Sequence, residues 1–124
     1  MKKKSISQLK KLADAVFSRW LRETQRRADG WVRCYTCGAI NPIEAMQAGH
    51  YISRAINQLR YDERNVKVQC RSCNIFKHGA MDEFALELQK EYGLDILKIL
   101  AKEKRKLKQW KIKELEEIIS KYKG

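Results

Sequence analysis

The chain has 124 residues and a formal net charge of +12 at pH 7, with 27 Lys and Arg against 15 Asp and Glu. This length predicts a single domain over residues 1–124. The charge favours a polyanion partner, nucleic acid before anionic membrane, although a merely basic soluble protein would share it. No stretch approaches the ~18 consecutive apolar residues of a membrane span, and no signal peptide is recognisable, so we expect a cytoplasmic protein.

Residues 5–29 are predicted to form an N-terminal amphipathic helix, because apolar residues recur along them at helical spacing. Ser5 or Ser7 can cap its start, and Asp29-Gly30 provides a stop signal. Its basic residues lie mostly off the apolar stripe, either as a solvated face or as contacts with phosphates. The stripe consists of Ile6, Leu9, Leu12, Ala13, Val16, Phe17, Trp20 and Leu21.

Residues 31–80, which hold all four cysteines and both histidines, are predicted to form a small β-rich unit. Within it, the segment CGAINP (37–42) is expected to be a turn. CRSCNIFKH (70–78) is expected to begin a short helix that ends near Gly79. The β-prone runs are WVRCY (31–35), GHYIS (49–53) and NVKVQ (65–69).

Residues 81–123 are predicted to be helical again, with Asp82 as a candidate cap for the first helix. The order of elements is therefore helix, small β unit, helices, which places the chain in the α+β class.

The cysteines form two chelating pairs, Cys34-x-x-Cys37 and Cys70-x-x-Cys73. Two such turns complete a tetrahedron of thiolates around Zn²⁺. An iron–sulfur cluster or redox dithiols are the alternatives. Four sulfurs leave no position for a substrate, so we expect a structural zinc on which folding depends.

A second group of polar residues is threaded through this cysteine frame. His50 precedes Asn65 by fifteen residues, Asn74 follows after nine, and His78 after four more. Together they resemble an HNH (ββα-metal) endonuclease, in which a strand histidine is the general base, a loop asparagine orients it, and a following helix supplies a metal ligand. The resemblance implies a small zinc-stabilised ββα-metal core over residues 31–80, flanked by the N-terminal and C-terminal helices.

A closer resemblance is carried by CYTCG, AGHY and LRYDERNVKVQCRSCNIFKHG. These segments are similar to the phage recombination protein NinG (Rap) family, regarded as nucleases of branched DNA such as Holliday junctions and D-loops. The likeness covers roughly residues 10–80. It implies a bacteriophage protein that acts in the host cell, here expected to lack the N-terminal cysteine-rich segment of longer relatives.

The resemblance assigns His50, Asn65 and Asn74 to catalysis. A histidine accepts a proton from water near neutral pH, so His50 can serve as the base, with Asn65 setting its orientation. Asn74 and His78 would hold one catalytic Mg²⁺ or Mn²⁺, since residues four apart on a helix project from the same side. Purely structural roles are the alternatives. His50 could be a hydrogen-bonded strand histidine, Asn65 a turn residue, Asn74 a helix cap and His78 a histidine at a helix end.

The sequence departs from the HNH pattern directly before His50. Many HNH enzymes carry Asp or His there as a further metal ligand, whereas this chain has Gly49, preceded by Ala48 and Gln47. Asp62 or Glu63 is the candidate for the missing carboxylate.

Five basic residues near these positions are candidates for binding the DNA backbone: Arg54, Arg60, Arg64, Arg71 and Lys77. Three aromatic residues, Tyr51, Tyr61 and Phe76, are expected in the small core rather than as stacking platforms for bases.

The favoured function is a metal-dependent endonuclease that acts on branched DNA. This enzyme would contain the structural Zn²⁺ and a catalytic Mg²⁺ or Mn²⁺. A twofold dimer would make paired incisions simple, so a homodimer is expected as well. The alternatives are a non-catalytic zinc-stabilised DNA-binding module and an HNH nuclease with sequence preference.

Overall fold

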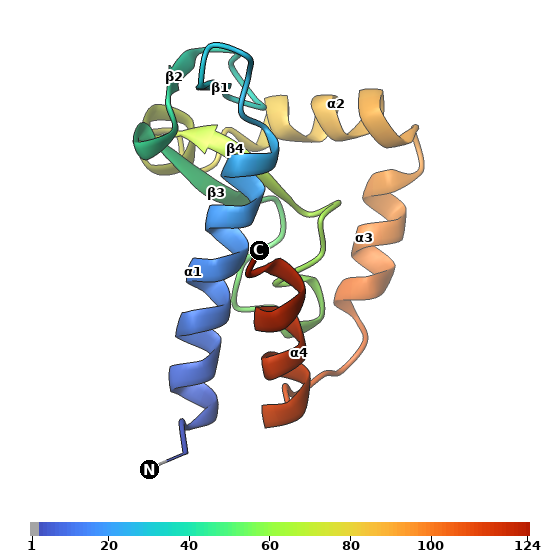
Figure 1. The fold of residues 1–124 in the computed structure, drawn as a ribbon. Coiled ribbons are helices and arrows are strands. Elements are labelled where there is room, and N and C mark those ends of the chain that lie inside the picture. The colour runs from blue at the N-terminus through green and yellow to red at the C-terminus, as the bar shows by residue number, and fades with distance from the viewer. Residues whose placement is uncertain (1–2) are drawn as a thin grey trace.

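The computed structural model describes residues 3–124, so the first two residues of the predicted domain lie outside it. The chain folds as a mixed α+β protein, which confirms the predicted class (Figure 1). The helices are α1 (Ile6–Thr24), α2 (Met81–Tyr92), α3 (Ile96–Lys104) and α4 (Ile112–Tyr122), and the strands are β1 (Trp31–Arg33), β2 (Ile40–Pro42), β3 (Met46–His50) and β4 (Val66–Cys70). Short helical turns are η1 (Ile43–Ala45), η2 (Asn57–Leu59) and the π-helix η3 (Ser72–Phe76).

Helix α1 begins with a capping box, in which Ser5 and Gln8 each bind the backbone N–H of the other. Its buried face is narrower than the predicted stripe, because the i, i+4 row Leu9, Ala13, Phe17 and Leu21 packs on the core. Ile6 and Leu12 belong to the predicted stripe but are 42% and 38% exposed.

The end of α1 also differs from the predicted stop at residue 29. The helix stops at Thr24, where the N–H of Gln25 binds the carbonyl of Arg22 and the N–H of Arg26 binds the carbonyl of Glu23. The N–H of Arg27 then binds the carbonyl of Trp31 at 2.8 Å, which leads the chain into β1.

Two antiparallel strand pairs make up the β unit. In the first, Arg33 pairs with Ile40, so part of the segment predicted as a turn is strand β2. Its strand character comes from pairing with β1, a partner that its own sequence does not reveal. In the second, β3 and β4 are in register from Met46 opposite Cys70 to His50 opposite Val66.

The helices cover this β unit through two apolar clusters. In Figure 1, α1 and α4 lie side by side along one flank, and Phe17 of α1 joins Leu115 and Tyr122 of α4 in the first cluster. Helices α2 and α3 build the second cluster around Phe84 and Leu100. No helix within residues 3–124 combines the length and apolarity needed to cross a membrane.

Helix α2 does not begin at the predicted cap. Its N-cap is Ala80, which has a left-handed backbone with φ of 49°, and Asp82 lies in the first turn instead. An acidic residue at that position still stabilises the helix by interacting with its dipole.

Candidate functional site

The four cysteines come together at one end of the β3–β4 pair. Cys34 follows β1, Cys70 ends β4 and Cys73 lies in η3, while Cys37 belongs to the turn before β2. All four Sγ atoms lie within 4.8 Å of one another. The cluster therefore ties the β1–β2 hairpin to the segment that carries Asn74.

The spacing of the sulfur atoms fits a tetrahedral zinc ion. Zn–S bonds of ~2.3 Å at tetrahedral angles separate the sulfurs by ~3.8 Å, and the Sγ atoms of Cys37 and Cys70 are 3.7 Å apart. The N–H groups of Ala39 and Cys73 point at the Sγ atoms of Cys37 and Cys70, at 3.4 and 3.5 Å. Such donors stabilise thiolates, the form that binds metal.

The ionisation of Cys34 also favours metal binding. Burial raises the pKa of its thiol, but hydrogen bonds from the Thr36 hydroxyl and from backbone amides outweigh burial and lower the pKa to about 6. Burial raises the pKa of the Cys37 and Cys73 thiols, so zinc binding has to displace their protons. The clustering of the four sulfurs allows them to bind one zinc ion, as their spacing in the sequence predicts.

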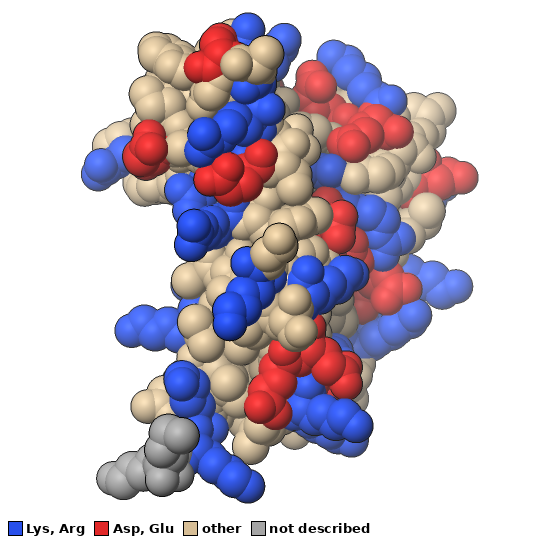
Figure 2. Space-filling model, in the orientation of Figure 1, with Lys and Arg blue, Asp and Glu red and all other residues tan. Residues whose placement is uncertain are grey.

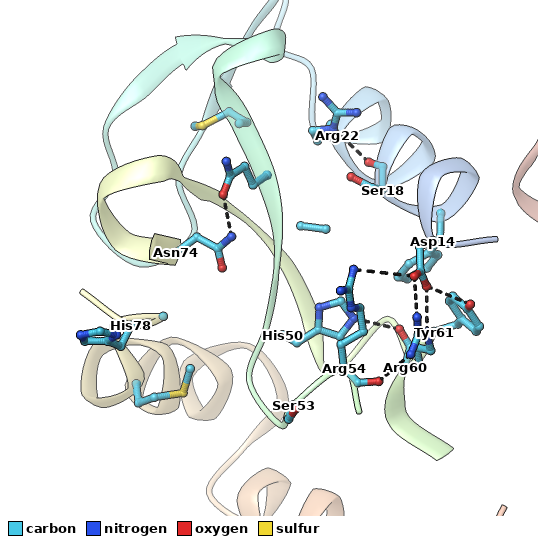
Figure 3. Close-up of a pocket in the computed structure, with 16 residues that line it drawn as sticks. Asp14, Ser18, Arg22, His50, Ser53, Arg54, Arg60, Tyr61, Asn74 and His78 are labelled. Carbon is cyan, nitrogen blue, oxygen red and sulfur yellow. Dashed lines mark hydrogen bonds and ion pairs between the residues drawn. The ribbon is translucent and has the colours of Figure 1, made fainter. Parts of the chain in front are cut away.

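His50 lies in a separate cavity of about 600 Å³ between α1 and the β3–β4 unit (Figure 3). The cavity is open to solvent and is lined by groups from α1, β3, the loop after β3, and the segment after β4. The polar groups that matter most below are Asp14, Arg22, His50, Arg54, Asn74 and His78.

The imidazole of His50 is half-buried and held by one hydrogen bond, between its Nε2 atom and the carbonyl of Arg60 at 3.0 Å. A carbonyl only accepts, so Nε2 carries the proton and Nδ1 keeps its lone pair. Burial lowers the pKa of His50, the carbonyl of Arg60 raises it, and the positive charge of Arg54 lowers it further, with a net shift below 6.5. The ring is therefore neutral at neutral pH and able to accept a proton.

Asn65 is fully buried and contacts the loop after β3 rather than the ring of His50. Its side chain accepts from the N–H of Ile52 at 2.8 Å and donates to the carbonyls of Ile52 and Leu59 at 2.9 and 3.2 Å. Leu59 directly precedes Arg60, whose carbonyl holds His50. Asn65 thus shapes the loop that orients the imidazole.

Asn74 and His78 both line the cavity, but they are not two positions of one helix. Helix η3 ends at Phe76, and His78 follows in a turn with a positive φ of 50°. The helical i, i+4 geometry behind the predicted metal-ligand role of His78 is therefore wrong. Asn74 donates through Nδ2 to the Oε1 atom of Gln47 on β3 at 2.7 Å, which leaves its own Oδ1 atom available to a ligand.

Close packing accounts for the glycine before His50. A Cβ atom at Gly49 would lie 1.8 Å from the Oε1 atom of Gln69, whose side chain is fully buried. Gln69 is fixed there because its Nε2 atom donates to Thr36 and to the carbonyl of Gly79. A metal-binding side chain therefore has no room at this position.

The candidate carboxylates Asp62 and Glu63 point elsewhere. Asp62 binds Arg64 at 2.6 Å, and Glu63 accepts from the hydroxyl of Tyr122 at 2.9 Å. Neither lines the cavity, whose carboxylate is Asp14 of α1. Within residues 3–124, the cysteine cluster is the one group of three or more Cys, His, Asp or Glu side chains close enough to bind a common ion.

The predicted DNA-binding residues have different surroundings. Arg54 lines the cavity, its side chain is 62% exposed, and its guanidinium lies 3.7 Å from the carboxylate of Asp14. Arg60 is only 14% exposed and binds the same carboxylate at 2.5 Å. Arg64 is paired with Asp62 outside the cavity. The remaining two, Arg71 and Lys77, are exposed beside η3.

Helix α1 contributes cavity residues that the sequence interpretation missed. Asp14, Ser18 and Arg22 recur at i, i+4 and i+8, so they form a polar row beside the buried stripe and face the cavity (Figure 3). This spacing is visible in the sequence, but it does not by itself indicate a cavity, because a polar row on a helix usually faces solvent. On the face shown in Figure 2, basic side chains are spread over α1 and the C-terminal helices with acidic ones between them.

Phe76 contradicts its predicted place in the core. It is 69% exposed at the end of η3, and the guanidinium of Arg71 lies 5.8 Å from its ring centre. Tyr61 is buried as expected, and Tyr51 packs against Phe84. Residues two apart on a helix project from nearly opposite sides, so with Asn74 facing the cavity, Phe76 points to solvent.

Fold and cysteine cluster define a small α+β protein with a site that can bind one zinc ion. A family model described as Bacteriophage Lambda NinG protein matches residues 1–124. The chain belongs to the NinG family, which confirms that part of the resemblance. No solved structure matches the chain significantly.

Curated relatives agree with the family match. The chain is 30% identical over 122 residues to protein ninG of Escherichia phage 933W, covering 92% of this chain and 60% of the relative. It is 29% identical over 122 residues to protein ninG of Escherichia phage lambda, covering 92% of this chain and 59% of the relative. It is 32% identical over 94 residues to protein ninG of Salmonella phage P22, covering 69% of this chain and 46% of the relative. The chain thus spans about 60% or less of the length of these relatives.

Proposed function

We propose that the chain is a metal-dependent endonuclease of the HNH type that hydrolyses phosphodiester bonds in branched DNA during phage recombination. The observation that carries this proposal is the setting of His50. Its Nε2 atom is bound to the carbonyl of Arg60, so the basic Nδ1 atom is left for a water molecule in an open cavity. A neutral imidazole placed in this way is a competent general base.

The surrounding elements support the same reaction. Strand β3 ends at His50, β4 follows antiparallel to it, and η3 then brings Asn74 to the same cavity. This is the order in which an HNH core presents its base and its metal ligand. The side chain of Arg54 is 62% exposed and only loosely paired with Asp14, at 3.7 Å, so its guanidinium can also hold a phosphate beside the base.

The cation proposed for this site is Mg²⁺ or Mn²⁺. Bound there, it would neutralise charge on the scissile phosphate and stabilise the leaving 3′ oxygen. The Oδ1 atom of Asn74 is the protein ligand that the contacts leave available, since its Nδ2 atom is used by Gln47. A hard amide oxygen suits Mg²⁺, which keeps several waters and relies on substrate phosphates.

A second candidate is a non-catalytic zinc-stabilised DNA-binding module. The lack of a second cluster of Cys, His, Asp or Glu ligands within residues 3–124 favours it, and the charge of +12 serves either function. A sequence-preferring nuclease has less support, because no described contact orients the basic side chains for reading bases.

One experiment separates these candidates. Purified protein is incubated with a labelled four-way junction, a flap and a plain duplex, each with Mg²⁺, Mn²⁺ or EDTA. The proposal expects cleavage of the branched substrates that needs added cation. Binding without cleavage supports the module, and cutting of plain duplex at a fixed sequence supports the sequence-preferring nuclease. Light scattering with and without junction tests the proposed homodimer.

A further inference from the structure

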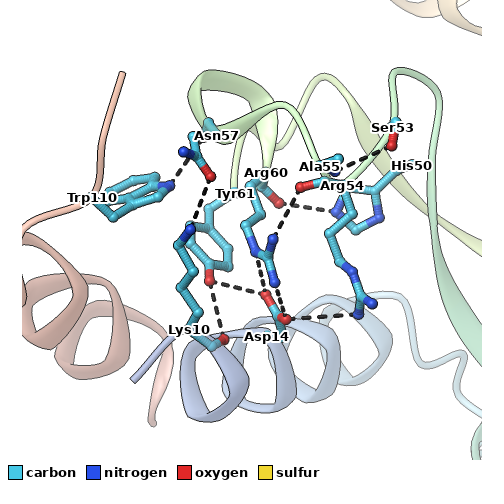
Figure 4. Close-up of polar contacts among 10 residues, drawn as sticks. All are labelled: Lys10, Asp14, His50, Ser53, Arg54, Ala55, Asn57, Arg60, Tyr61 and Trp110. Atoms are coloured by element: carbon cyan, nitrogen blue, oxygen red, sulfur yellow. Dashed lines mark hydrogen bonds and ion pairs between the residues drawn. The ribbon is translucent and has the colours of Figure 1, made fainter. Parts of the chain in front are cut away.

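Asp14 of α1 lies at the centre of a polar cluster that connects this helix to the loop after β3 (Figure 4). Its carboxylate accepts from the Nε and Nη2 atoms of Arg60 at 2.8 and 2.5 Å, and from the hydroxyl of Tyr61 at 2.9 Å. The side chains of Asp14 and Arg60 are 20% and 14% exposed, so water competes only weakly for this pair. Two parallel hydrogen bonds fix the orientation of the guanidinium as well as its position.

The backbone of Arg60 is the group that holds His50. Its carbonyl lies 3.0 Å from the Nε2 atom of the ring, and this contact selects the tautomer in which Nδ1 is free to accept a proton. Two polar anchors set the place of that carbonyl. Asn65 binds the preceding carbonyl of Leu59, and Asp14 binds the side chain of Arg60 itself.

We infer that Asp14 is a positioning residue for His50, which acts by fixing the Arg60 carbonyl and thereby the tautomer and direction of the imidazole. The inference deepens the proposed function and rests on it, since it assigns helix α1 to the machinery of that same base. Both oxygens of Asp14 are already bound by Arg60, which sets Asp14 apart from a metal ligand.

The tautomer can be measured without DNA. The chain has only two histidines, so nitrogen NMR of the imidazoles at about pH 8 gives a clear assignment with His78 as an internal reference. Wild type is expected to show His50 as the Nε2–H tautomer. Asp14→Asn is expected to give a mixture of both tautomers at His50 and no change at His78.

Asp62→Asn is the matched control. Asp62 also binds an arginine of the same loop through two oxygens, at 3.0 and 2.6 Å, but has no hydrogen bond to Arg60. It should leave the His50 tautomer unchanged. In junction cleavage, Asp14→Asn should lower kcat by about tenfold or more with little change in KM, Asp62→Asn should have little effect, and Asp14→Glu should restore part of the loss.

A persistent Nε2–H tautomer at His50 in folded Asp14→Asn overturns the inference, and so does an equal change in the Asp62→Asn control. If Asp14→Asn does not fold, Arg60→Met tests the same link, because it keeps the backbone carbonyl and removes the guanidinium. If wild type cuts no DNA, the proposed function fails while the tautomer result still decides the role of Asp14.

Discussion

The cysteine cluster and His50 lie at opposite ends of the same strand pair, and the cavity that His50 lines extends along β3 as far as Met46. At one end, Cys70 is paired with Met46 and is one of four cysteines that can complete the coordination of a single zinc ion. At the other end, His50 is paired with Val66, and one of its nitrogens faces an open cavity. Four sulfurs that close a coordination sphere can only stabilise the fold, whereas an imidazole nitrogen in an open cavity can react with a substrate.

This comparison also explains how the two regions depend on each other. Cys73 and Asn74 are neighbours in η3, so the cluster fixes the segment that brings Asn74 to the cavity. Removing the metal should destroy both regions, while changes in the cavity should leave the cluster intact. The predictions below test this asymmetry, beginning with the largest effect.

Cys73→Ser is expected to prevent stable folding at neutral pH. Structural zinc sites contribute about 10–16 kcal/mol of apparent binding free energy, more than a domain of this size has to spare. Metal content by mass spectrometry and the circular dichroism melting curve measure the effect. A zinc-free Cys73→Ser protein that melts like wild type would show that the cluster is not structural.

His50→Ala should reduce junction cleavage by about 10²–10⁴-fold, because a general base contributes that much to a rate. Junction affinity, zinc content and melting temperature should stay near wild type. Glu117→Ala is the control, since this exposed residue of α4 lies outside the cavity, and its rate should stay within about threefold of wild type. Cutting by His50→Ala, with contaminating nuclease excluded, would remove His50 as the base.

Gly49→Ala should lower the free energy of unfolding by about 1–3 kcal/mol, since its Cβ atom would force the buried side chain of Gln69 to move. Urea unfolding measures the loss. In a Gln69→Ala background the same substitution should cost almost nothing, so the double-mutant cycle isolates this one contact. An equal cost in both backgrounds would mean that the glycine is needed for another reason.

The pH dependence should report the environment of His50. Burial is the main cause that holds its pKa below 6.5, so the base stays neutral and kcat/KM should fall only at pH values below 6.5, by about tenfold per pH unit. Arg54→Gln removes a positive charge that lowers this pKa, and the acid limb should move to higher pH. The assignment would be contradicted if kcat/KM of the wild type already fell at pH values above 6.5, or if the acid limb of Arg54→Gln moved to lower pH.

Local spacing made parts of this protein predictable. Each Cys-x-x-Cys pair places two sulfurs in one turn, so the cluster follows from sequence once two such turns are present. The buried row on α1 likewise follows from i, i+4 periodicity, which depends only on the geometry of the helix. The placement of His50 and Asn74 in one cavity agrees with the family resemblance of residues 48–79.

Other features arise from contacts between distant segments, which a single sequence does not specify. Strand β2 exists because it pairs with β1. Gly49 is required because Gln69 crosses above it from the neighbouring strand.

The sequence by itself determined the α+β order of elements and the four cysteines that can bind zinc, because both depend on residue type and short-range spacing. Only the tertiary structure decided that His78 lies off the helix and that Asp14 reaches the loop holding His50. Asp14 and Arg60 are 46 residues apart in the chain. The packing of α1 against the β unit brings them together, and no local pattern encodes that approach.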